Sequence, residues 1–575
     1  MPQRPPVVLG LCSGTHDSAA ALLSGGVLVG LVEEERLNGE KHTRAFPRKA
    51  IDWLLDHADL TSDEVSAVAY NFDPRLYRRG VLSSLPYLLG GATWRRALPR
   101  ANSFRTVHHR AAERLAALAD GFPGARVVGV EHHRAHGMYA FAASGYESAA
   151  VLIVDSLGET TTTSIARARL DGEGVRYDPV ARINDPASLG YAYGAVTQHL
   201  GWRRGDEEGT VMALAALGDP ARFRDLFRRA IRLTENGFIL DPAIFPLRVI
   251  SSRYPRLSPE FIAATCPSRT GNDNGGVPLD VHADLAAALQ ERTEQVMVHL
   301  ARRARDLTGE PLLCVGGGVA MNCVSIGAIV QDSAFDEVAV PPAPGDAGTA
   351  AGAALAHYAD MTGALAGGVA RRCYLGPDYH GVDLFGRPHD GMSARAITDP
   401  ARYLARRLAD GQIVGVFQGR LEAGPRALGN RSILASPLRP DVVDRLNSTV
   451  KFREPFRPFA PVVLEDKAAD YFTLGQPSPF MSIASRVTPL ARKTIPTVVH
   501  ANGTARAQTV TRERNPLLAE VLTAFAELTG VPVLINTSLN IKGKPICGTP
   551  EMALDCLRES GLDALLLEQW WVEKT

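Results

Sequence analysis

Four residues far apart in the chain have the side chains needed to hold one metal ion. His132 and His136 lie in the segment HHRAH, Asp155 ends the apolar run VLIVD, and Asp346 lies in PGDAG. Histidines four residues apart project from the same face of a helix, so both imidazoles can bind one ion. Two imidazoles and two carboxylates suit Fe(II), Mn(II) or Zn(II) and leave room for an oxygen ligand. An HxxxH pair alone is more often a structural feature, and the two aspartates are what favour a metal site.

A glycine-rich turn in the same half of the chain predicts nucleotide binding. Gly316, Gly317 and Gly318 follow an apolar run and precede a helical segment that contains Asn322. Such a turn lets a phosphate approach the backbone amides at a helix N-terminus. One glycine turn is weak evidence, but two similar turns occur earlier in the chain, and the three together favour a nucleotide site.

Basic residues in the last third of the chain predict an anion site. They lie among Gly, Asn and Ser residues, in segments that read as loops, whereas a solvated helix face would show helical spacing. Fixed guanidinium groups suit a phosphate or a carbamoyl oxygen, and a lysine adds a point charge. Asn536, Thr537, Ser538 and Asn540 lie near the end of a predicted strand, where they can add hydrogen bonds. The basic residues are Arg426, Arg431, Lys451, Arg453, Arg457 and Arg506.

The alternation of apolar runs and helical segments predicts an α/β protein with two domains. The chain has 575 residues, which is too long for one hydrophobic core. We expect a first domain at 1–365, a Gly-rich linker at 366–390 and a second domain at 391–575. Helices are predicted at 48–58, 282–308, 347–360 and 399–409, and residues 235–280 read as an irregular insertion. Strands are predicted at 65–72, 125–130 and 149–155, and in QIVGVFQG and VPVLINTS.

The bulk composition excludes several classes of protein. The 62 basic and 62 acidic residues give a net charge of zero, which argues against binding nucleic acid through its phosphates. The seven cysteines form no CxxC pair and read as reduced thiols. No secretion signal or membrane-length apolar run is visible. We expect a cytoplasmic protein with no nucleic-acid or membrane partner.

The chain resembles the O-carbamoyltransferases of natural-product biosynthesis and their nodulation relatives. This family carbamoylates tobramycin, cephamycin, novobiocin, ansamycins and macrolides. The resemblance covers nearly the whole chain, because eight motifs occur in the family's order. They are HHRAH, VLIVDSLGE, VGGGVAMN, PPAPGDAG, GPRALGNRS, NSTVKFREPFRPFAP, GTARAQTV and NTSLNIKGKPI.

The resemblance implies a fold for each domain and a reaction in two steps. The first domain would be an actin-like ATPase fold of the threonylcarbamoyl-transferase type, and the second a YrdC-like α/β domain. Carbamoyl phosphate and ATP, the latter with Mg(II), would give carbamoyl-adenylate in the second domain. The first domain, with a metal expected to be Fe(II), would then move the carbamoyl group to a hydroxyl of an antibiotic or other secondary metabolite such as a macrolide, an aminoglycoside or another glycoside. A homodimer is compatible with the resemblance.

The resemblance also implies roles for individual residues. It places the metal ligands on His132, His136, Asp155 and Asp346, in agreement with the residue chemistry. His16 would lie close to the transfer site and accept the proton of the acceptor hydroxyl. Arg426, Lys451 and Arg457 would offset charge as phosphate departs. The implied carbamoyl-phosphate contacts are Arg426, Arg431, Lys451, Arg457, Arg506 and Ser538.

One departure and three alternatives stay open at this point. Relatives commonly carry a lysine where this chain has Thr210, which puts the details of that pocket in doubt. A tRNA threonylcarbamoyl transferase shares the chemistry, but the zero net charge and the fused domains speak against it. A hydrogenase-maturation carbamoyltransferase should carry CxxC zinc motifs. A non-catalytic ATP-binding regulator would leave the basic cluster and the four candidate ligands without a use.

Overall fold

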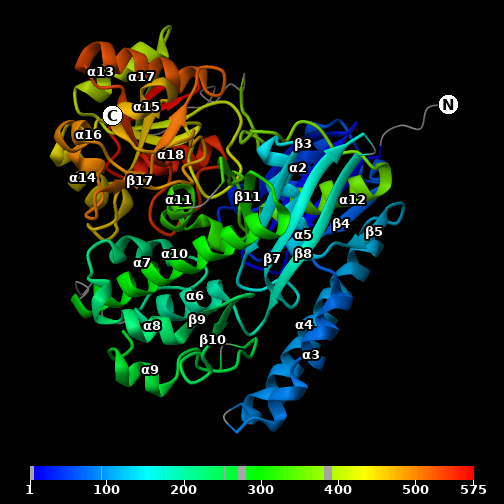
Figure 1. Ribbon diagram of the computed structural model, residues 1–575. Helices are drawn as coiled ribbons and strands as arrows, with labels where there is room; N and C mark the ends of the chain where they lie inside the picture. The colour runs from blue at the N-terminus through cyan, green and yellow to red at the C-terminus, as the bar shows by residue number, and fades with distance from the viewer. Residues whose placement is uncertain are drawn as a thin grey trace. The chain divides into compact units, whose positions relative to one another are not determined.

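The structure, a computed structural model, divides the chain into two compact units (Figure 1). The first unit comprises Met1–Leu31 and Arg44–Arg372, and the second comprises Val32–Thr43 and Cys373–Thr575. The break at Arg372 falls inside the stretch predicted as a linker, whereas nothing in the sequence indicated that Val32–Thr43 belongs to the second unit. The structure describes residues 6–91, 93–172, 174–251, 253–269, 280–332, 335–380 and 391–575. Residues 381–390 of the predicted linker therefore lie outside the described residues.

Two five-stranded mixed sheets form the framework of the first unit. Their orders are β3-β2-β1-β4-β5 and β8-β7-β6-β11-β12. The first sheet contains β1 Val8–Cys12, β2 Ala19–Ser24, β3 Val27–Glu33, β4 Ala67–Tyr70 and β5 Arg126–Gly129. The second contains β6 Ser148–Val154, β7 Thr161–Asp171, β8 Gly174–Asn184, β11 Leu312–Gly316 and β12 Glu337–Ala339.

The two sheets repeat one topology. In each, the central strand (β1 or β6) pairs antiparallel with the following strand and parallel with a strand that comes much later in the chain. A further parallel strand, β5 or β12, then completes that side. The repeat is one of topology, and no repeat is visible in the sequence. The mixed α/β class predicted from the sequence is confirmed.

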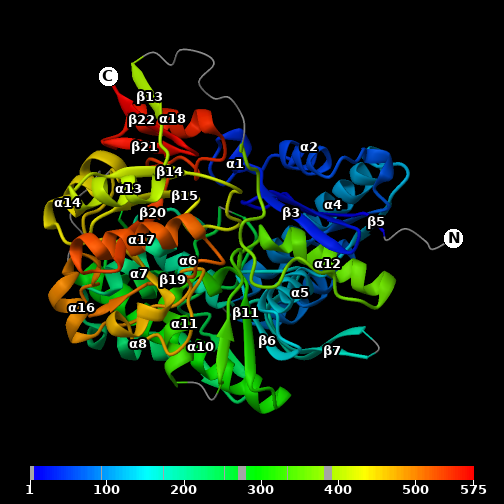
Figure 2. The same cartoon turned by 90° about the horizontal axis from the view of Figure 1, so that it is seen from above.

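Two helices lie between these sheets and bring the candidate ligands together (Figure 2). They are α5 His132–Ser144 and α12 Gly348–Thr362. A Cβ on Gly10 of β1 would lie 2.0 Å from the Ala350 carbonyl oxygen, so α12 packs directly on the first sheet. A Cβ on Gly352 would lie 1.8 Å from the Ala135 carbonyl oxygen. Both approaches need glycine, because any side chain would push the backbones apart.

Of the remaining helices of the first unit, α6 to α10 group on one side of this framework, and α3 and α4 extend away from it (Figure 1). The sequence predictions at 48–58 and 282–308 correspond to α2 Arg48–His57 and α10 Asp280–Thr308. The others include α3 Tyr77–Leu82, α4 Trp94–Gly121, α6 Leu189–His199, α7 Glu208–Ala215, α8 Arg224–Ala230 and α11 Cys323–Asp332.

The prediction that residues 235–280 are irregular is wrong for part of their described length. Strand β10, Gly237–Leu240, pairs antiparallel with β9, Ile231–Thr234, and α9 follows at Pro259–Ala264. The two-residue turn between the strands is Glu235-Asn236, and Gly237 opens β10; the dipeptide Asn236-Gly237 is common at hairpins and was the available signal.

The second unit is built on an eight-stranded sheet, in the order β13-β22-β21-β14-β15-β20-β16-β19. Its core packs α13, Pro400–Ala409, and α17, Pro516–Thr529, against apolar side chains of the sheet. Helix α18, Pro550–Glu559, follows near the C-terminus. The strands are β13 Met392–Ala396, β14 Val414–Phe417, β15 Arg431–Ala435, β16 Ala460–Leu464, β19 Gln508–Val510, β20 Val533–Ser538, β21 Ala564–Leu567 and β22 Trp570–Lys574.

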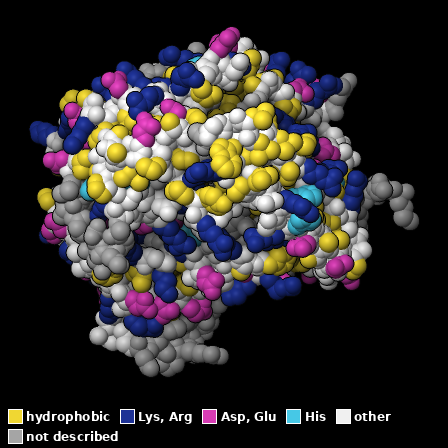
Figure 3. Space-filling view, turned by 90° about the horizontal axis from the view of Figure 1, so that it is seen from below, with side chains coloured by type: hydrophobic (Ala, Val, Ile, Leu, Met, Phe, Trp, Pro, Cys, Tyr) yellow, Lys and Arg dark blue, Asp and Glu magenta, His cyan; other side chains and the backbone are white. Residues whose placement is uncertain are grey.

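One face of the molecule is drawn in space-filling form in Figure 3. Hydrophobic side chains gather near the middle of this face, and basic side chains lie around them with fewer acidic ones. Among the described residues, none of the helices is both long and apolar enough to span a bilayer.

Candidate functional site

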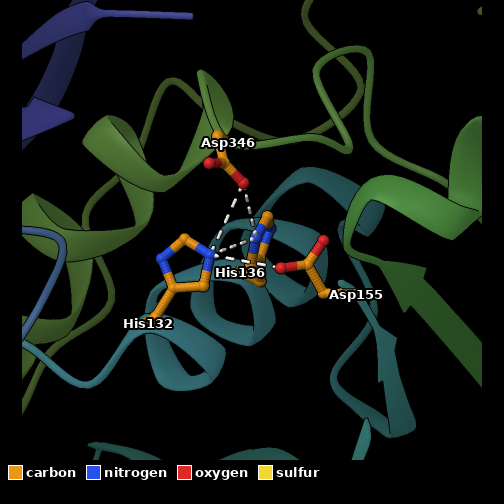
Figure 4. A group of neighbouring side chains, drawn as sticks. All are labelled: His132, His136, Asp155 and Asp346. Carbon is orange, nitrogen blue, oxygen red and sulfur yellow. Dashed lines mark hydrogen bonds and ion pairs between the residues drawn. The ribbon is translucent and has the colours of Figure 1, made fainter. Parts of the chain in front are cut away.

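The four predicted metal ligands converge in the first unit (Figure 4). His132 is the first residue of α5 and His136 follows one turn later, so both rings leave the same side of the helix. Asp155 comes directly after β6, and Asp346 lies two residues before α12. The close contact between α5 and α12 therefore brings Asp346 to the two histidines.

The spacing of the four donor atoms fits one bound cation. His132 Nε2 lies 3.1 Å from His136 Nε2, 3.5 Å from Asp346 Oδ1 and 3.6 Å from Asp155 Oδ2. His136 Nε2 lies 3.7 Å from Asp346 Oδ1. Donors that each sit about 2.0–2.2 Å from an ion are separated by roughly 3–3.6 Å. The cluster therefore has the size and the mixed nitrogen and oxygen donors of a divalent-metal site.

Backbone groups orient the ligands. His132 Nδ1 lies 3.2 Å from the Asn71 carbonyl oxygen, so Nδ1 carries the proton and Nε2 keeps its lone pair for an ion. The ring stacks on Phe72 with centroids 4.4 Å apart. The Gly318 amide donates to Asp155 Oδ1 at 3.1 Å, which leaves Oδ2 directed toward His132.

The electrostatics of the cluster favour positive charge at its centre. Burial lowers the pKa of His132, but the hydrogen bonds and charges of Asp155 and Asp346 outweigh burial and raise it well above its ordinary value. Burial raises the pKa of Asp346, yet the two histidines bring it well below its usual range. Two buried carboxylates thus stay ionised and need a cation, which a divalent ion supplies in place of protons.

His133, the middle histidine of HHRAH, does not belong to the cluster. Its Nδ1 lies 2.9 Å from Ser164 Oγ, and the residue is buried. Burial lowers the pKa of His133 to about 3, so the ring is neutral. It therefore provides an internal comparison for the two candidate ligands.

His16 lies in the loop after β1 and is partly exposed. Its Nδ1 is 2.8 Å from Asp17 Oδ2, and its ring lies against Gly205. Burial lowers the pKa of His16, but the Asp17 hydrogen bond and charge, with contributions from Asp346 and Asp155, raise it to about 9. The charges of Asp346 and Asp155 thus act on His16, which places it near the four candidate metal ligands. The Asp17 contact orients the ring, and with this pKa the imidazole is protonated at pH 7.

The glycine loop predicted to bind a nucleotide supports the metal ligands. A Cβ on Gly317 would lie 2.4 Å from the Val154 carbonyl oxygen, and the Gly318 amide donates to Asp155. Asn322 donates to Gln290 Oε1 at 2.9 Å and accepts from the Ser325 amide at 3.0 Å. A nucleotide contact at Gly316–Gly318 and Asn322 stays a prediction.

Lys451 is the centre of the polar site in the second unit. It is buried, and its Nζ donates to Asn540 Oδ1 at 2.7 Å, to the Asn540 carbonyl at 3.0 Å and to Ser538 Oγ at 3.2 Å. It also donates to the Ser538 carbonyl. Burial and the nearby charges of Arg453 and Arg457 lower the pKa of Lys451 to about 7.

Two arginines, Arg453 and Arg457, add like charge near this lysine, and Arg506 acts in turn on Arg453. Burial lowers the pKa of Arg453 to about 9, together with the charges of Arg457 and Arg506. Glu454 Oε2 lies 3.9 Å from Arg457 Nη1, and it is the acid that offsets part of this charge. Cations that lower each other's pKa are stabilised by a bound anion. Lys451, Arg453, Arg457 and Arg506 thus form a chain of cations that influence one another, and anion binding by them stays a prediction.

Arg431 and Arg426 occupy different places from this cluster. Arg431 is completely buried, and its Nη atoms donate to the carbonyls of Gln418, Asn430, Pro377 and Gly419 at 2.6–3.2 Å. Its guanidinium also lies 3.6 Å from the centroid of the Phe417 ring. Arg431 holds the loop backbone in place, and its Nη donors are directed at carbonyls and not at a phosphate site. Arg426 is half-buried in the loop before β15.

Sequence reasoning missed groups that act through the backbone or through burial. The Asn71 carbonyl, which orients His132, could not be predicted because a backbone carbonyl is present at every residue. Glu159 accepts from the amides of Asp73 at 2.8 Å and His132 at 3.2 Å, and so fixes the start of α5. Burial raises the pKa of Glu159 to about 7. Its place beside a conspicuous aspartate in VDSLGE was the available signal.

Comparisons with known proteins identify the family. The model described as "Carbamoyltransferase N-terminus" matches residues 7–355, and "Carbamoyltransferase C-terminus" matches 405–574. An uncharacterized protein of Synechocystis is 34% identical over 99% of this chain and 97% of its own length. Nodulation protein NolNO of Sinorhizobium fredii is 34% identical over 97% of this chain and 79% of its own.

Likeness to solved structures is weaker. HypF in its phosphate- and nucleotide-bound form aligns with a TM-score of 0.32 and 12% identity, over 63% of this chain and 56% of that one. This score is too low to support a fold assignment. The two family matches, each over most of one unit, carry the identification. The chain belongs to the carbamoyltransferase family and is an enzyme that transfers a carbamoyl group.

Proposed function

We propose that this enzyme is an ATP-dependent O-carbamoyltransferase that acts on a hydroxyl of a small natural product. The observation that carries the proposal is the four-ligand cluster of the first unit, in a chain that both family models match. The basic cluster of the second unit supplies the second requirement, a place for an anionic carbamoyl donor. The duplicated sheet topology supports the actin-like assignment of the first unit, and the YrdC-like assignment of the second rests on the resemblance.

The activation step takes place in the second unit. Carbamoyl phosphate loses its phosphate to water, and a carbamate oxygen attacks the α-phosphorus of ATP. Pyrophosphate leaves, and carbamoyl-adenylate forms. Overall, carbamoyl phosphate, water and ATP give carbamoyl-adenylate, phosphate and pyrophosphate. ATP, with Mg(II), is therefore consumed in stoichiometric amounts.

Lys451 and its neighbours perform the charge compensation in this step. Lys451 is fixed by Ser538 and Asn540, so its ammonium offers a preorganised charge to the departing phosphate. Arg457 and Arg506 bind the phosphate oxygens from guanidinium forks. Arg426 and Ser538 complete the proposed contacts.

The transfer step takes place in the first unit. His132, His136, Asp155 and Asp346 would hold a divalent ion, most simply Fe(II), Mn(II) or Zn(II), whose Lewis acidity polarises the carbamoyl carbonyl when it is bound. The acceptor oxygen attacks the carbamoyl carbon, and the bond to the AMP phosphate oxygen breaks. His16 takes the hydroxyl proton in its neutral form, which with a pKa of about 9 is the minor form at pH 7, so transfer should become faster as the pH rises toward 9. Asp17 holds the ring in place.

The acceptor class is proposed from the relatives. The named relatives include several nodulation proteins, and the sequence resemblance points to antibiotic and other secondary-metabolite pathways in the cytoplasm. A macrolide, an aminoglycoside or another glycoside fits this proposal. The zero net charge continues to speak against a tRNA acceptor.

Mass spectrometry of a coupled reaction tests the proposal. The enzyme is incubated with ATP, carbamoyl phosphate and a panel of hydroxylated natural products, and carbamate esters and AMP are measured together. Equal amounts of ester and AMP are expected with a suitable acceptor. A protein that binds ATP but releases no pyrophosphate under any metal would instead be a non-catalytic regulator.

A further inference from the structure

An exposed hydrophobic surface lies on the helical hairpin of α3 and α4, away from the chemistry described above. Leu89 is 93% exposed, Leu82 is 65% exposed and Leu98 is 61% exposed. Six of the nineteen large hydrophobic side chains that are exposed in the described residues fall within this short segment. Such clustering marks an interaction surface, since single exposed leucines are normally scattered. The apolar hairpin surface consists of Leu82, Leu85, Leu88, Leu89, Trp94 and Leu98.

The hairpin is a packed element that displays this surface. Helices α3 and α4 lie side by side (Figure 1), and a Cβ on Gly80 would lie 2.3 Å from the Phe104 ring. Ala97, Arg100 and Phe104 are buried, so one face of α4 packs inward. Trp94 and Leu98, four residues apart, share a different face of the helix. The buried face of α4 therefore fixes the hairpin to the rest of the unit, and the apolar hairpin surface stays exposed.

The hairpin is also strongly basic. Between Pro74 and Ala112 the chain has eight arginines and no aspartate or glutamate. Arg75 pairs with Asp73, and Arg100 pairs with Asp185. Among the described residues, five others are exposed and have no carboxylate within ion-pair distance. These are Arg78, Arg79, Arg95, Arg105 and Arg110.

The loop that packs on the hairpin has the same charge. Arg96 donates to the carbonyls of Leu247 at 3.2 Å and Pro255 at 3.1 Å, which fixes this loop against α4. From 242 to 259 the chain contains Arg248, Arg253 and Arg256 and no acid. Arg248 is buried and pairs with Asp185 at 3.5 Å, so Arg253 and Arg256 are the charges that this segment adds to the hairpin.

We propose that the apolar hairpin surface docks on an anionic lipid bilayer. Leucines and a tryptophan beside unpaired arginines are the combination with which peripheral proteins enter the headgroup region of acidic membranes. A second copy of the chain is disfavoured as the occupant, because two such surfaces would bring like charges together. The lack of a membrane-length apolar run had led us to expect no membrane partner, but docking on a bilayer surface needs no such run.

Vesicle sedimentation with the full-length protein tests this inference. Vesicles of phosphatidylcholine, alone or mixed with phosphatidylglycerol, are the probe. We expect binding to the mixed vesicles, weakening as salt screens the arginines. Leu89→Glu combined with Trp94→Glu should abolish it, whereas Leu528→Glu, at a leucine of α17 that is 53% exposed, should not. Arg78→Glu and Arg79→Glu should each lower the partition coefficient at least roughly fivefold.

Two results would overturn the inference. One is equal sedimentation with both kinds of vesicle, or none with either, by a wild-type protein that is folded and active in pyrophosphate release. The other is self-association without vesicles that the Leu89→Glu, Trp94→Glu variant loses, which would assign the surface to a second copy. Carbamoyl transfer to a soluble acceptor should be the same in the variant and the wild type, so this test is independent of the proposed reaction.

Discussion

The Nε2 atoms of His132 and His136 lie 3.1 Å apart, each within 3.7 Å of Asp346 Oδ1. The Asn71 carbonyl accepts a hydrogen bond from the Nδ1–H group of His132, so the Nε2 atom of this ring is not a donor when the ring is neutral. A cation bound between the two rings would be coordinated by these closely spaced nitrogen and oxygen atoms. We therefore expect His132 and His136 to bind a metal ion, and His133 not to bind it.

Removing either ligand should remove the metal. We expect His136→Ala to lower metal affinity by more than the roughly 10–100-fold that a change outside the ligand shell costs. His133→Ala is the matched control on the same helix and should keep the metal, with a stability loss of about 1–3 kcal/mol from the lost Ser164 contact. Elemental analysis of the purified variants, with thermal unfolding, distinguishes the two. Full metal content in His136→Ala would contradict the assigned ligand set.

The contact between α5 and α12 should be necessary for the metal site. Gly352→Ala places a Cβ 1.8 Å from the Ala135 carbonyl oxygen, so α12 must move away from α5 and carry Asp346 with it. We expect a loss of about 1–3 kcal/mol in the free energy of unfolding and weaker metal binding. Gly121→Ala, at the end of α4 with no atom near the added Cβ, should change neither quantity by more than about 1 kcal/mol. Denaturant unfolding with and without a chelator measures both effects.

Lys451 should make anion binding depend on pH. Its pKa, lowered to about 7 by burial, Arg453 and Arg457, rises when an anion binds, so binding takes up a proton. Affinity for sulfate, which does not itself titrate in this range, should therefore fall as the pH rises above about 7. Calorimetry in two buffers of different ionisation enthalpy would detect the proton. Lys451→Met should remove both effects, and the exposed Lys467→Met should leave them unchanged.

The lowered pKa of Lys451 also affects the free energy of unfolding of the protein without a bound anion. Between pH values of about 7 and the ordinary lysine pKa of 10.5, the unfolded chain binds the Lys451 proton more tightly than the folded chain. The contribution of Lys451 to stability therefore rises with pH in this window and is smallest below it. Comparing unfolding of the wild type and Lys451→Met at pH 6.5 and 9 isolates this slope, which would be absent if the lysine kept an ordinary pKa.

His16 should act in transfer and not in activation. His16→Gln keeps a similar shape but cannot take the hydroxyl proton, so carbamate formation should fall by about 10²–10⁴-fold. Pyrophosphate release, metal content and the thermal midpoint should stay at wild-type values. Single-turnover assays of both half-reactions provide the comparison. Full transfer activity in His16→Gln would remove the proton-acceptor role.

The sequence predicted the parts of this enzyme whose chemistry resides in side chains at regular spacing. HHRAH predicted two converging imidazoles because the helix period is fixed, and the placing of Asp155 beside them followed from an apolar run that ends at a carboxylate. The sequence did not show that the guanidinium group of Arg431 donates its hydrogen bonds to backbone carbonyls, because the burial of a loop arginine depends on tertiary packing. The association of Val32–Thr43 with the second unit and the repeated sheet topology likewise depend on contacts between distant segments.

The central claim is that the second unit activates the carbamoyl group and the metal cluster of the first unit transfers it. The most direct measurement is pyrophosphate release from ATP and carbamoyl phosphate by the wild type, Arg457→Ala and His136→Ala. We predict release by the wild type and by His136→Ala, which lacks only the transfer site, and none by Arg457→Ala. Equal release by the wild type and Arg457→Ala, or no release by any of the three with any metal, would contradict the account.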